Sequence, residues 1–335
     1  MILSLMESLR ILCLNWRCIR NPEAGGAEIY THMLLKGLSK LGHEVFLITS
    51  SAPGLPMKEE IAGYTINRYG NKFTVYLKAC INYLKFFKGK VDFIIDEVNT
   101  IPFLTPLYAR ESIIMFIHQL AGRAWFYHTP PPIAISGYML EPLLLNLYKK
   151  VRTVVTVSES SKKSLERIIG KDEILIIKPA PSVYSFKSIK KTDYPQTCYI
   201  GRIVPYKRIE DQILAARLVS SKIKGYRHVI AGRGWPKYVR KLKQMTLRLG
   251  LDRVIEFKGE ISRKEKIELL SSSWIFIYTS YGEGYGIAGL DAAACSTPVI
   301  AYRTRGLVDL ANDIGALLVD IGDINGLAEI IIHLI

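Results

Sequence analysis

Residues 274–298 read WIFIYTSYGEGYGIAGLDAAACSTP and contain, in one stretch, the features from which the fold can be predicted. The apolar run at residues 274–280 is typical of a strand that is covered by helices on both faces. A glycine-rich loop follows, and then an apolar segment of helical length that ends before Thr297-Pro298. A buried strand, a loop and a helix in this order form the repeating unit of a parallel α/β sheet.

The same alternation of short strands and longer helical segments runs along the whole sequence. Residues 27–41 are one example of the helical segments, with apolar side chains at helical spacing. The alternation predicts doubly wound parallel sheets, and thirteen strands are too many for a single such sheet. We expect strands at residues 10–16, 44–50, 64–69, 91–96, 113–118, 151–158, 173–178, 197–203, 228–232, 254–259, 274–280, 299–302 and 316–320.

A proline-rich stretch at residues 178–182, followed by polar residues, interrupts the series of strands near its middle. We therefore predict two Rossmann-like α/β domains, one of residues 1–182 with seven strands and one of residues 183–335 with six. Folds of this kind bind ligands at the carboxyl ends of their strands. Two such domains are expected to face each other across a cleft.

Composition excludes several classes of protein. Of the 335 residues, 49% are hydrophobic and 22% charged, which is too apolar for a disordered chain. No apolar stretch reaches the roughly 18 residues that a membrane-spanning helix needs. The five cysteines are scattered and odd in number, which favours free thiols in a reducing cytoplasm over a disulfide framework.

The net charge of +15 is concentrated in one part of the chain. Residues 187–266 carry 21 basic and 7 acidic side chains, a net +14, whereas residues 267–335 are net negative. A basic block of this kind attracts phosphates or polyanions through its local field. An ordinary solvated basic surface is an equally simple interpretation.

The first candidate site is the loop at residues 21–28, between the first strand and the first helix. Gly25 and Gly26 allow a ligand to approach the backbone, and the amides at the start of the helix favour anionic groups. A Gly-Gly pair is nevertheless more often only a turn. The dinucleotide-binding pattern G-x-G-x-x-G is absent from this loop, which argues against a nicotinamide enzyme.

The second candidate site follows the first strand of the second domain. Arg202 and Lys207 lie at the carboxyl edge of that strand, where a guanidinium and an ammonium could hold a pyrophosphate. The alternative is a surface loop that happens to be basic.

The third candidate site lies in the opening stretch. Glu283 stands in the glycine-rich loop and Asp291 follows along the helix, so both carboxylates could face one cleft. Carboxylates suit sugar and ribose hydroxyls, and the amides near Gly286 and Ile287 suit a phosphate. One site would thus serve both halves of a nucleotide sugar. The alternative interprets Glu283 as a helix N-terminal charge and Asp291 as a surface residue.

Six segments, in this order and spacing, resemble the family 4 retaining glycosyltransferases of the GT-B fold over nearly the whole chain. They are Gly25-Gly26-Ala27-Glu28, Phe116-Ile117-His118-Gln119, residues 156–160, Gly201-Arg202 with Lys207, Ala231-Gly232-Arg233-Gly234, and Glu283-Gly284-Tyr285-Gly286 through residues 297–300.

The resemblance implies roles for single residues. Arg202 and Lys207 would neutralise the donor diphosphate as it leaves, Glu283 would hold hydroxyls of the transferred sugar, and Asp291 would bind the ribose. His118, which alone would be taken for a core histidine, would lie near the sugar and complete the catalytic set. The residues implied in donor binding are Gly25, Gly26, Gly201, Gly232, Gly284, Tyr285, Gly286, Ile287 and Asp291. Position 291 departs from the family pattern, which has Glu there.

The activity implied is transfer of a sugar from a UDP- or GDP-linked donor to a glycan or lipid-linked acceptor, with retention of anomeric configuration. The resemblance implies no cofactor and no metal, and the sequence has no metal-ligand spacing. The alternative is a non-catalytic relative that binds a nucleotide or a nucleic acid. The basic block would serve nucleic-acid binding in that case. No nucleic-acid recognition motif is present, however, so we do not expect the chain to bind a nucleic acid.

Residues 73–90 mix aromatic and aliphatic side chains with lysines. A basic amphipathic helix of this composition can lie on an anionic bilayer, which would bring the chain into peripheral contact with the inner membrane face. The alternative is an ordinary domain helix with its lysines in solvent. Residues 127–132, which include three consecutive prolines, are expected to form a stiff loop.

Overall fold

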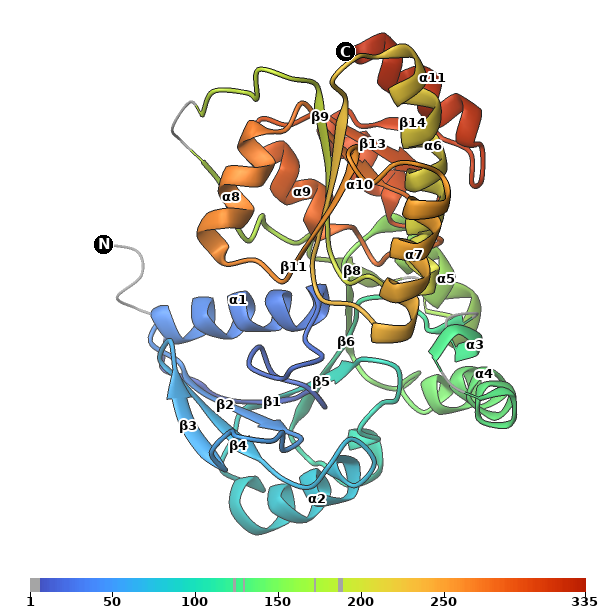
Figure 1. The fold of residues 1–335 in the computed structure, drawn as a ribbon. Coiled ribbons are helices and arrows are strands. Elements are labelled where there is room, and N and C mark those ends of the chain that lie inside the picture. Colours follow the sequence, from blue (N-terminus) through green and yellow to red (C-terminus); the bar gives the residue numbers. More distant parts are fainter. Residues whose placement is uncertain (1–6, 123–124, 129, 172, 186–188) are drawn as a thin grey trace. The chain divides into compact units, whose positions relative to one another are not determined.

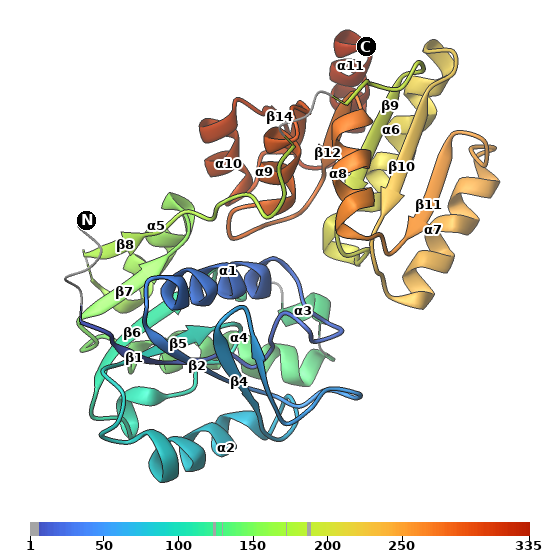
Figure 2. The ribbon, with the colours of Figure 1, turned by 90° about the vertical axis from the view of Figure 1, so that its left-hand side faces the viewer.

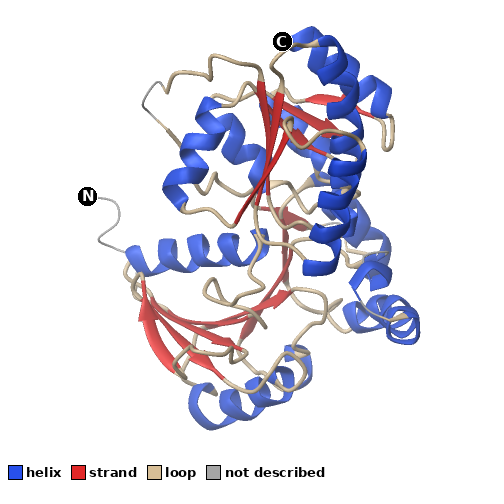
Figure 3. Cartoon of the chain, in the orientation of Figure 1, coloured by secondary structure: helices blue, strands red, loops and turns tan. Residues whose placement is uncertain are grey.

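The computed structural model describes residues 7–122, 125–128, 130–171, 173–185 and 189–335 (Figure 1). The chain divides into two units, Met1–Lys178 (unit 1) and Pro179–Ile335 (unit 2). Each contains one largely or wholly parallel sheet with helices on its faces (Figure 3), which confirms the predicted α/β class with two domains. The division falls four residues before the position expected from sequence, because Ser182 and Val183 are bonded to Asp291 of unit 2.

Unit 1 contains a sheet with the strand order β3-β4-β2-β1-β5-β6-β7-β8. All neighbouring strands are parallel except the β3–β4 pair. The elements are β1 (Arg10–Leu14), α1 (Gly26–Lys40), β2 (Glu44–Thr49), β3 (Lys58–Ile61), β4 (Tyr64–Arg68), α2 (Val75–Asn82), η2 (Tyr83–Phe87), β5 (Phe93–Val98), η3 (Thr105–Leu107), β6 (Ser112–Ile117), α3 (Trp125–His128), α4 (Pro131–Asn146), β7 (Thr153–Thr156), α5 (Glu159–Ile169) and β8 (Ile174–Ile176).

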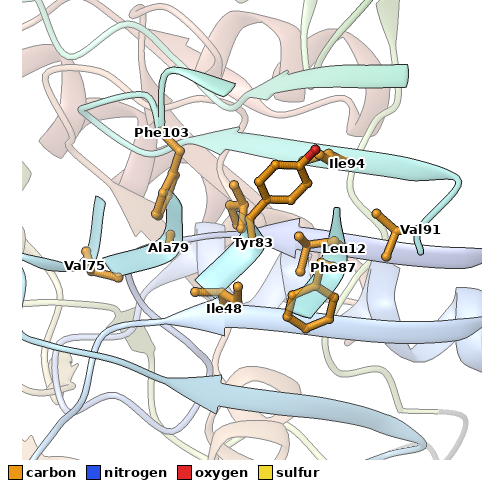
Figure 4. Packing of buried hydrophobic residues seen from close by; sticks show 10 residues of the cluster. Leu12, Ile48, Val75, Ala79, Tyr83, Phe87, Val91, Ile94 and Phe103 are labelled. Carbon is orange, nitrogen blue, oxygen red and sulfur yellow. The ribbon is translucent and has the colours of Figure 1, made fainter. Parts of the chain in front are cut away.

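The core of unit 1 lies on both faces of this sheet. On one face, α2 and η2 pack against β1, β2 and β5, and the buried side chains of this cluster interlock in Figure 4. α1 covers the opposite face, as both views show (Figures 1 and 2). Continuously apolar strands such as β1 are therefore buried from both sides, as their composition predicts.

The segment expected to form one amphipathic helix is helical in two parts. α2 is an α-helix, and η2 continues it as a π-helical turn. Val75, Ala79, Tyr83 and Phe87 recur every fourth residue and are all buried in the same cluster. The wider π turn keeps that spacing on the sheet side, which a straight α-helix would rotate away over three turns.

The prediction of a stiff loop at residues 127–132 is wrong for most of these residues. Residues 125–128 form α3, and α4 begins at Pro131, while Thr129 lies outside the described residues. Proline is compatible with the first helical turn, where its missing N–H has no intrahelical acceptor. The proline run therefore starts a helix.

The sequence prediction missed one described strand, β3. It pairs antiparallel with β4 at the edge of the sheet, through a turn at Ala62 and Gly63 whose φ angles are both positive. This two-residue turn is typical of a β-hairpin. The strand itself, Lys58-Glu59-Glu60-Ile61, is too polar to be recognised by apolar periodicity.

Unit 2 contains a fully parallel sheet with the strand order β11-β10-β9-β12-β13-β14. Its elements are β9 (Gln196–Ile200), η5 (Pro205–Lys207), α6 (Ile209–Lys222), β10 (Arg227–Ala231), α7 (Pro236–Arg248), β11 (Ile255–Gly259), α8 (Arg263–Ser272), β12 (Ile275–Tyr278), α9 (Ile287–Ala294), β13 (Val299–Tyr302), α10 (Leu307–Ile314), β14 (Leu317–Val319) and α11 (Ile324–Leu334).

Among the described residues, none of the helices has the length and apolar character that crossing a membrane requires. The five cysteines are free thiols, four of them buried.

Candidate active site

The loops after β9 and β10 in unit 2 are bonded together along their backbones. Gly201 N–H donates to Ala231 O (3.0 Å), and Ile203 N–H donates to Arg233 O (2.8 Å). Gly232 has φ +132°, and a Cβ atom there would lie 1.9 Å from Gly201 O. Only glycine fits this position, so Gly201 and Gly232 form one rigid junction at the carboxyl edge of the sheet.

A cavity of about 460 Å³ opens beside this junction. Its volume falls in the usual range for small-ligand pockets. Three basic side chains and one acidic side chain reach it, so it favours an anionic ligand. The lining residues include Ile203, Arg233, Lys243, Phe257, Lys258 and Glu260.

Lys207 and Glu283 form an ion pair in unit 2. Lys207 ends the short 3-10 turn η5 and is buried, and its Nζ donates to Glu283 Oε1. The rings of Tyr206 and Tyr278 lie beside the same ammonium, with Nζ 5.0 and 5.2 Å from their centroids. The two rings and the carboxylate together stabilise a cation in a largely desolvated place.

The backbone of Glu283 is fixed by the loop after β13. Glu283 N–H donates to Arg305 O (3.2 Å). Gly306 has φ +73°, and a Cβ atom there would lie 2.2 Å from Glu283 O. The loop that carries Glu283 is therefore packed against Gly306 so closely that no side chain fits between them.

Arg202 reaches the same region through Tyr206. The Arg202 guanidinium is half-buried and donates to Tyr206 Oη (3.1 Å), and Tyr199 Oη donates to Arg202 O (2.9 Å). The structure thus brings Arg202, Lys207 and Glu283 together, as the sequence analysis expected of the candidate phosphate and sugar groups.

The start of α9 lies in the loop of Glu283. Gly286 is the residue before the helix, with φ +106°, and Ile287 is its first residue. Tyr285 is buried, and its Oη donates to Asp313 Oδ2 (2.5 Å). A Cβ atom at Gly306 would also meet Gly284. The contacts of Gly284 with Gly306 and of Tyr285 with Asp313 therefore fix the loop that joins Glu283 to the first amides of α9.

Burial raises the pKa of the Tyr278 phenol, and the negative charge of Glu283 raises it further. Tyr278 therefore stays a neutral phenol over the physiological pH range, and its ring face remains available to the Lys207 ammonium.

Asp291 is fully buried on α9 and has four donors. Ser182 donates to it from its N–H (2.5 Å) and its Oγ (2.7 Å), Val183 from its N–H (3.1 Å), and Lys266 from its Nζ (2.5 Å). The carboxylate fastens the first segment of unit 2 to α9 in this conformation. The ribose contact expected of Asp291 stays a prediction and requires these donors to be exchanged.

Unit 1 contains a second cluster at the carboxyl end of its own sheet. His118 Nε2 lies 2.6 Å from Glu97 Oε1, and Thr31 Oγ1 donates to the same oxygen (2.5 Å). The His118 ring meets Tyr30 edge-on at 5.2 Å, and Ser161 Oγ donates to His118 O (3.0 Å). The imidazole is therefore held by its ring contact with Tyr30 and by Glu97 at Nε2, and Ser161 holds the backbone of His118.

The Glu28 side chain holds the loop of Gly25 and Gly26 by hydrogen bonds. The buried Glu28 carboxylate accepts from Gly25 N–H (2.6 Å), Arg17 Nε (2.9 Å) and Asn99 Nδ2 (2.6 Å). Arg17 also donates to Glu23 O (2.9 Å). The backbone of the glycine loop is thus fixed by Glu28 and Arg17, and Gly26 is exposed to solvent.

Sequence reasoning missed the groups that support these residues. Their common signal is a polar side chain or glycine at or just beyond the carboxyl end of an apolar strand, the edge where parallel sheets place their sites. These residues are Arg17, Glu97, Asn99, Tyr206, Tyr278 and Gly306. Lys266 carried no such signal, and Glu28 was recognised only as part of the Gly25-Gly26-Ala27-Glu28 segment.

Within the part of the chain that the structure describes, no three His, Cys, Asp or Glu side chains are grouped so that they could hold a metal ion. The expectation of metal-free chemistry stays a prediction.

Two family models divide the chain between them. One described as Glycosyl transferases group 1 matches residues 182–335, and one described as Glycosyltransferase Family 4 matches residues 24–180. The chain belongs to the family 4 glycosyltransferases. The two matches adjoin at the boundary between the units, so each unit of this family 4 chain corresponds to one of them.

Among curated relatives, the O-antigen chain mannosyltransferase RfbU of Salmonella typhimurium is 27% identical over 204 residues. The match covers 58% of this chain and 52% of RfbU. The chain thus spans about half the length of this relative.

Solved glycosyltransferase structures share the fold of the chain over nearly all of it. The sucrose-phosphate synthase of Thermosynechococcus elongatus has a TM-score of 0.76 at 20% identity, covering 96% of this chain and 88% of that one. HepE of Anabaena, solved in complex with UDP-glucose, has a TM-score of 0.70 at 17% identity, with coverage of 96% and 88%. These likenesses confirm the GT-B fold for this family 4 member.

Proposed function

We propose that the chain transfers a hexose from a UDP- or GDP-linked donor to a glycan or lipid-linked acceptor, with retention of anomeric configuration. In this reaction the bond between the anomeric carbon and the diphosphate breaks, and a bond to an acceptor hydroxyl forms as that hydroxyl loses its proton.

The observation that carries the proposal is the grouping of Arg202, Lys207 and Glu283 in unit 2. A departing nucleoside diphosphate gains negative charge, and cations already fixed near it stabilise that charge without reorganising. Lys207 is fixed by two tyrosine rings and by Glu283, and Arg202 by Tyr206. In the proposal, donor phosphates replace Glu283 as the partner of Lys207, which frees the carboxylate for sugar hydroxyls.

The donor's nucleoside is assigned to the cavity next to Gly232. Its apolar wall of Ile203 and Phe257 suits a base, and its basic side chains suit the phosphate end of a nucleotide. HepE, which shares the fold, was solved in complex with UDP-glucose, and RfbU is an O-antigen chain mannosyltransferase. These names motivate the choice of UDP-glucose and GDP-mannose as first probes.

Gly25, Gly26 and His118 of unit 1 complete the proposed set. Gly26, which is exposed, would present its backbone amide to the donor phosphates, while Gly25, whose N–H is held by Glu28, would let them approach the backbone closely. His118 would position the donor or acceptor sugar. Two observations support these roles: Glu28 holds the glycine loop, and Glu97 holds the imidazole of His118.

The test begins with ligand binding by the full chain. UDP-glucose or GDP-mannose is expected to raise the melting temperature, because a ligand that binds only the folded state stabilises it by mass action. Release of nucleoside diphosphate is then followed with and without acceptor sugars or lipid extracts. The anomeric configuration of the product, read from its proton NMR couplings, tests retention.

Other outcomes would overturn the proposal in distinguishable ways. Binding of the nucleoside diphosphate with no transfer and no donor hydrolysis would assign the chain to the non-catalytic alternative, which the engaged state of Asp291 also fits. Salt-sensitive retention on DNA without any nucleotide-sugar binding would assign it to nucleic-acid binding.

A further inference from the structure

Two oppositely charged side chains, Arg233 and Glu260, line the cavity beside Gly232. Arg233 follows β10 and Glu260 follows β11, and these strands are parallel neighbours, so both residues lie at the carboxyl edge of the sheet. Arg233 Nη2 donates to both oxygens of the Glu260 carboxylate (2.7 and 2.6 Å), and Arg233 Nε donates to Oε2 (3.2 Å). The carboxylate and the guanidinium therefore adjoin each other in the cavity.

The backbone beneath this pair is fixed, whereas the side chains are open to solvent. Gly232 N–H donates to Gly259 O (2.6 Å), and Ile203 N–H donates to Arg233 O (2.8 Å). The side chains of Arg233 and Glu260 are 53% and 63% exposed. An exposed ion pair contributes little to stability, so a ligand in the cavity can take over its hydrogen bonds without displacing the backbone.

The same cavity has an apolar wall that suits the face of a base. Ile203, Val239 and Phe257 line it, and the Lys243 ammonium lies 5.8 Å from the centroid of the Phe257 ring. Stacking on such a wall does not distinguish one base from another, because every base has an apolar face. The choice between bases therefore depends on the polar side chains that meet the hydrogen-bonding groups along the rim of the base.

Guanine is the common base whose rim complements a carboxylate next to a guanidinium. Its N2–H and N1–H are neighbouring donors, and its O6 and N7 follow as neighbouring acceptors. A carboxylate offers two acceptor oxygens, and a guanidinium offers a fork of donors. The N1–H and N2–H groups also reproduce the planar pair of donors that Glu260 already binds in Arg233.

Uracil is a poorer match for the carboxylate. Its one ring N–H lies between two carbonyl oxygens, so a carboxylate there gains a single hydrogen bond and is repelled by the carbonyls on either side. Adenine and cytosine place an acceptor nitrogen beside their amino group and oppose a carboxylate in the same way. Setting acceptors against acceptors disfavours the wrong ligand as effectively as good contacts favour the right one.

We propose that Glu260 and Arg233 select guanine, so that the sugar donor is linked to GDP. Glu260 accepts from N1–H and N2–H of the base, and Arg233 donates to its O6 and N7. The assignment rests on the proposed function, since it names the nucleotide of the same donor. It adds Glu260 as a specificity-determining residue, to which the family resemblance assigned no role.

The test is calorimetric titration of the full chain with GDP, IDP and UDP in the absence of any sugar. The base of IDP differs from guanine only by lacking the N2 amino group, so it removes one of the two donors that Glu260 accepts. We expect GDP to bind about tenfold or more tightly than IDP, and UDP to bind no more tightly than IDP, because a bidentate contact discriminates between bases by about this factor.

Two variants separate the roles of the paired side chains. Glu260→Ala is expected to bring the affinities for GDP and IDP to within about twofold, because no carboxylate then recognises N2–H. Arg233→Ala is expected to weaken GDP and IDP alike, by about tenfold, because both bases keep O6 and N7. A purely structural role of Glu260 would instead weaken all three nucleotides equally and leave their ratios unchanged.

The matched control is Glu256→Ala. Glu256 is an exposed carboxylate on β11, the strand that leads to Glu260, but it does not line the cavity. This variant should keep the nucleotide affinities of the unchanged chain. Unaltered circular dichroism and melting temperatures show that each variant folds.

Two results would overturn the assignment alone. GDP could bind no more tightly than IDP or UDP, or the preference for GDP over IDP could persist in Glu260→Ala. The chain would still bind a nucleotide in both cases, and the proposed function would stand. If GDP, IDP and UDP all failed to bind, the assignment would fall together with the proposed function.

Discussion

Two carboxylates, Glu97 in unit 1 and Glu283 in unit 2, lie near the carboxyl ends of parallel strands and pair with a basic side chain. Glu97 lies within β5, almost completely buried, and its Oε1 contacts Thr31 and His118. Glu283 lies in a loop beyond β12, with its side chain 14% exposed. In unit 2 the carboxylate is the more exposed member of the pair and can exchange Lys207 for a ligand. In unit 1 the carboxylate is enclosed by the protein, and His118, with its side chain 13% exposed, is the member that a ligand could reach.

This difference predicts different consequences of mutation. A carboxylate that meets the substrate should be indispensable, whereas one that only orients a histidine should modulate the rate. Glu97 is accordingly a positioning residue, and Glu283 is a direct participant in the proposed reaction.

The largest effect is expected from Glu283→Ala. The variant should lose sugar transfer by roughly a thousandfold or more, because hydroxyl contacts and the partner of Lys207 disappear together. Initial rates of diphosphate release measure the loss. Glu268→Ala, an exposed carboxylate on α8, is the control and should leave the rate unchanged. Unchanged turnover in the Glu283 variant would refute the site.

Removing the cations should cost somewhat less. Arg202→Ala and Lys207→Met are each expected to reduce kcat by about a hundredfold to a thousandfold, the usual loss for one preorganised group that stabilises charge. The exposed Arg303→Ala provides a comparison that keeps the fold and the rate. If both variants affected only KM, the cations would bind the donor without stabilising its departing charge.

Gly232→Ala tests the junction beneath the unit 2 site. The added Cβ would meet Gly201 O, so we expect unit 2 to lose about 3 kcal/mol of stability in urea unfolding. Gly225 also has a positive φ, +78° against +132° at Gly232, but no neighbour within 4 Å, so Gly225→Ala should lose only about 1 kcal/mol. Equal losses in the two variants would mean that the close contact has no energetic role.

Glu97→Gln should slow transfer by about tenfold to a hundredfold while leaving donor affinity nearly unchanged. The measurement is a double-mutant cycle with His118→Ala. If Glu97 acts through His118, the double variant should be no slower than His118→Ala alone. Additive losses would show that Glu97 acts independently of the imidazole.

The smallest effect is the acid response of unit 2. Burial lowers the pKa of His228 to about 3, and its ring is held neutral between Thr197 and Gln212. The unfolded chain, with a histidine pKa near 6.5, binds the proton first, so stability falls as the pH drops below that value. The unfolding constant should rise by at most about tenfold per pH unit between pH 6.5 and 5.

The measurement is urea unfolding at several pH values, followed with a probe specific to unit 2. His228→Gln should flatten this dependence even if it lowers stability at neutral pH. A slope that persists in the variant would assign the acid response to other groups.

The sequence was sufficient to predict the α/β class, the strand–loop–helix repeats and the elements that carry Arg202, Lys207 and Glu283, because apolar strands and glycine loops are local signals. It could not show that Tyr206 and Tyr278 contact Lys207, since that depends on how the loops after β9 and β12 meet in space. The engagement of Asp291 by Ser182 was hidden for the same reason, as 109 positions separate them in the chain.

The polar composition of β3 kept the strand from being predicted, and the same polar residues suit it to the edge of the sheet. An unpaired edge of a sheet offers its amides and carbonyls to any passing chain, and charged residues discourage such additions. Lys58, Glu59 and Glu60 fill this edge, and Glu59 is also held by Arg20 and Arg68. Without the hairpin, the mostly buried strand β4 would become the open edge of the sheet, so this short charged strand shields that edge from pairing with another chain.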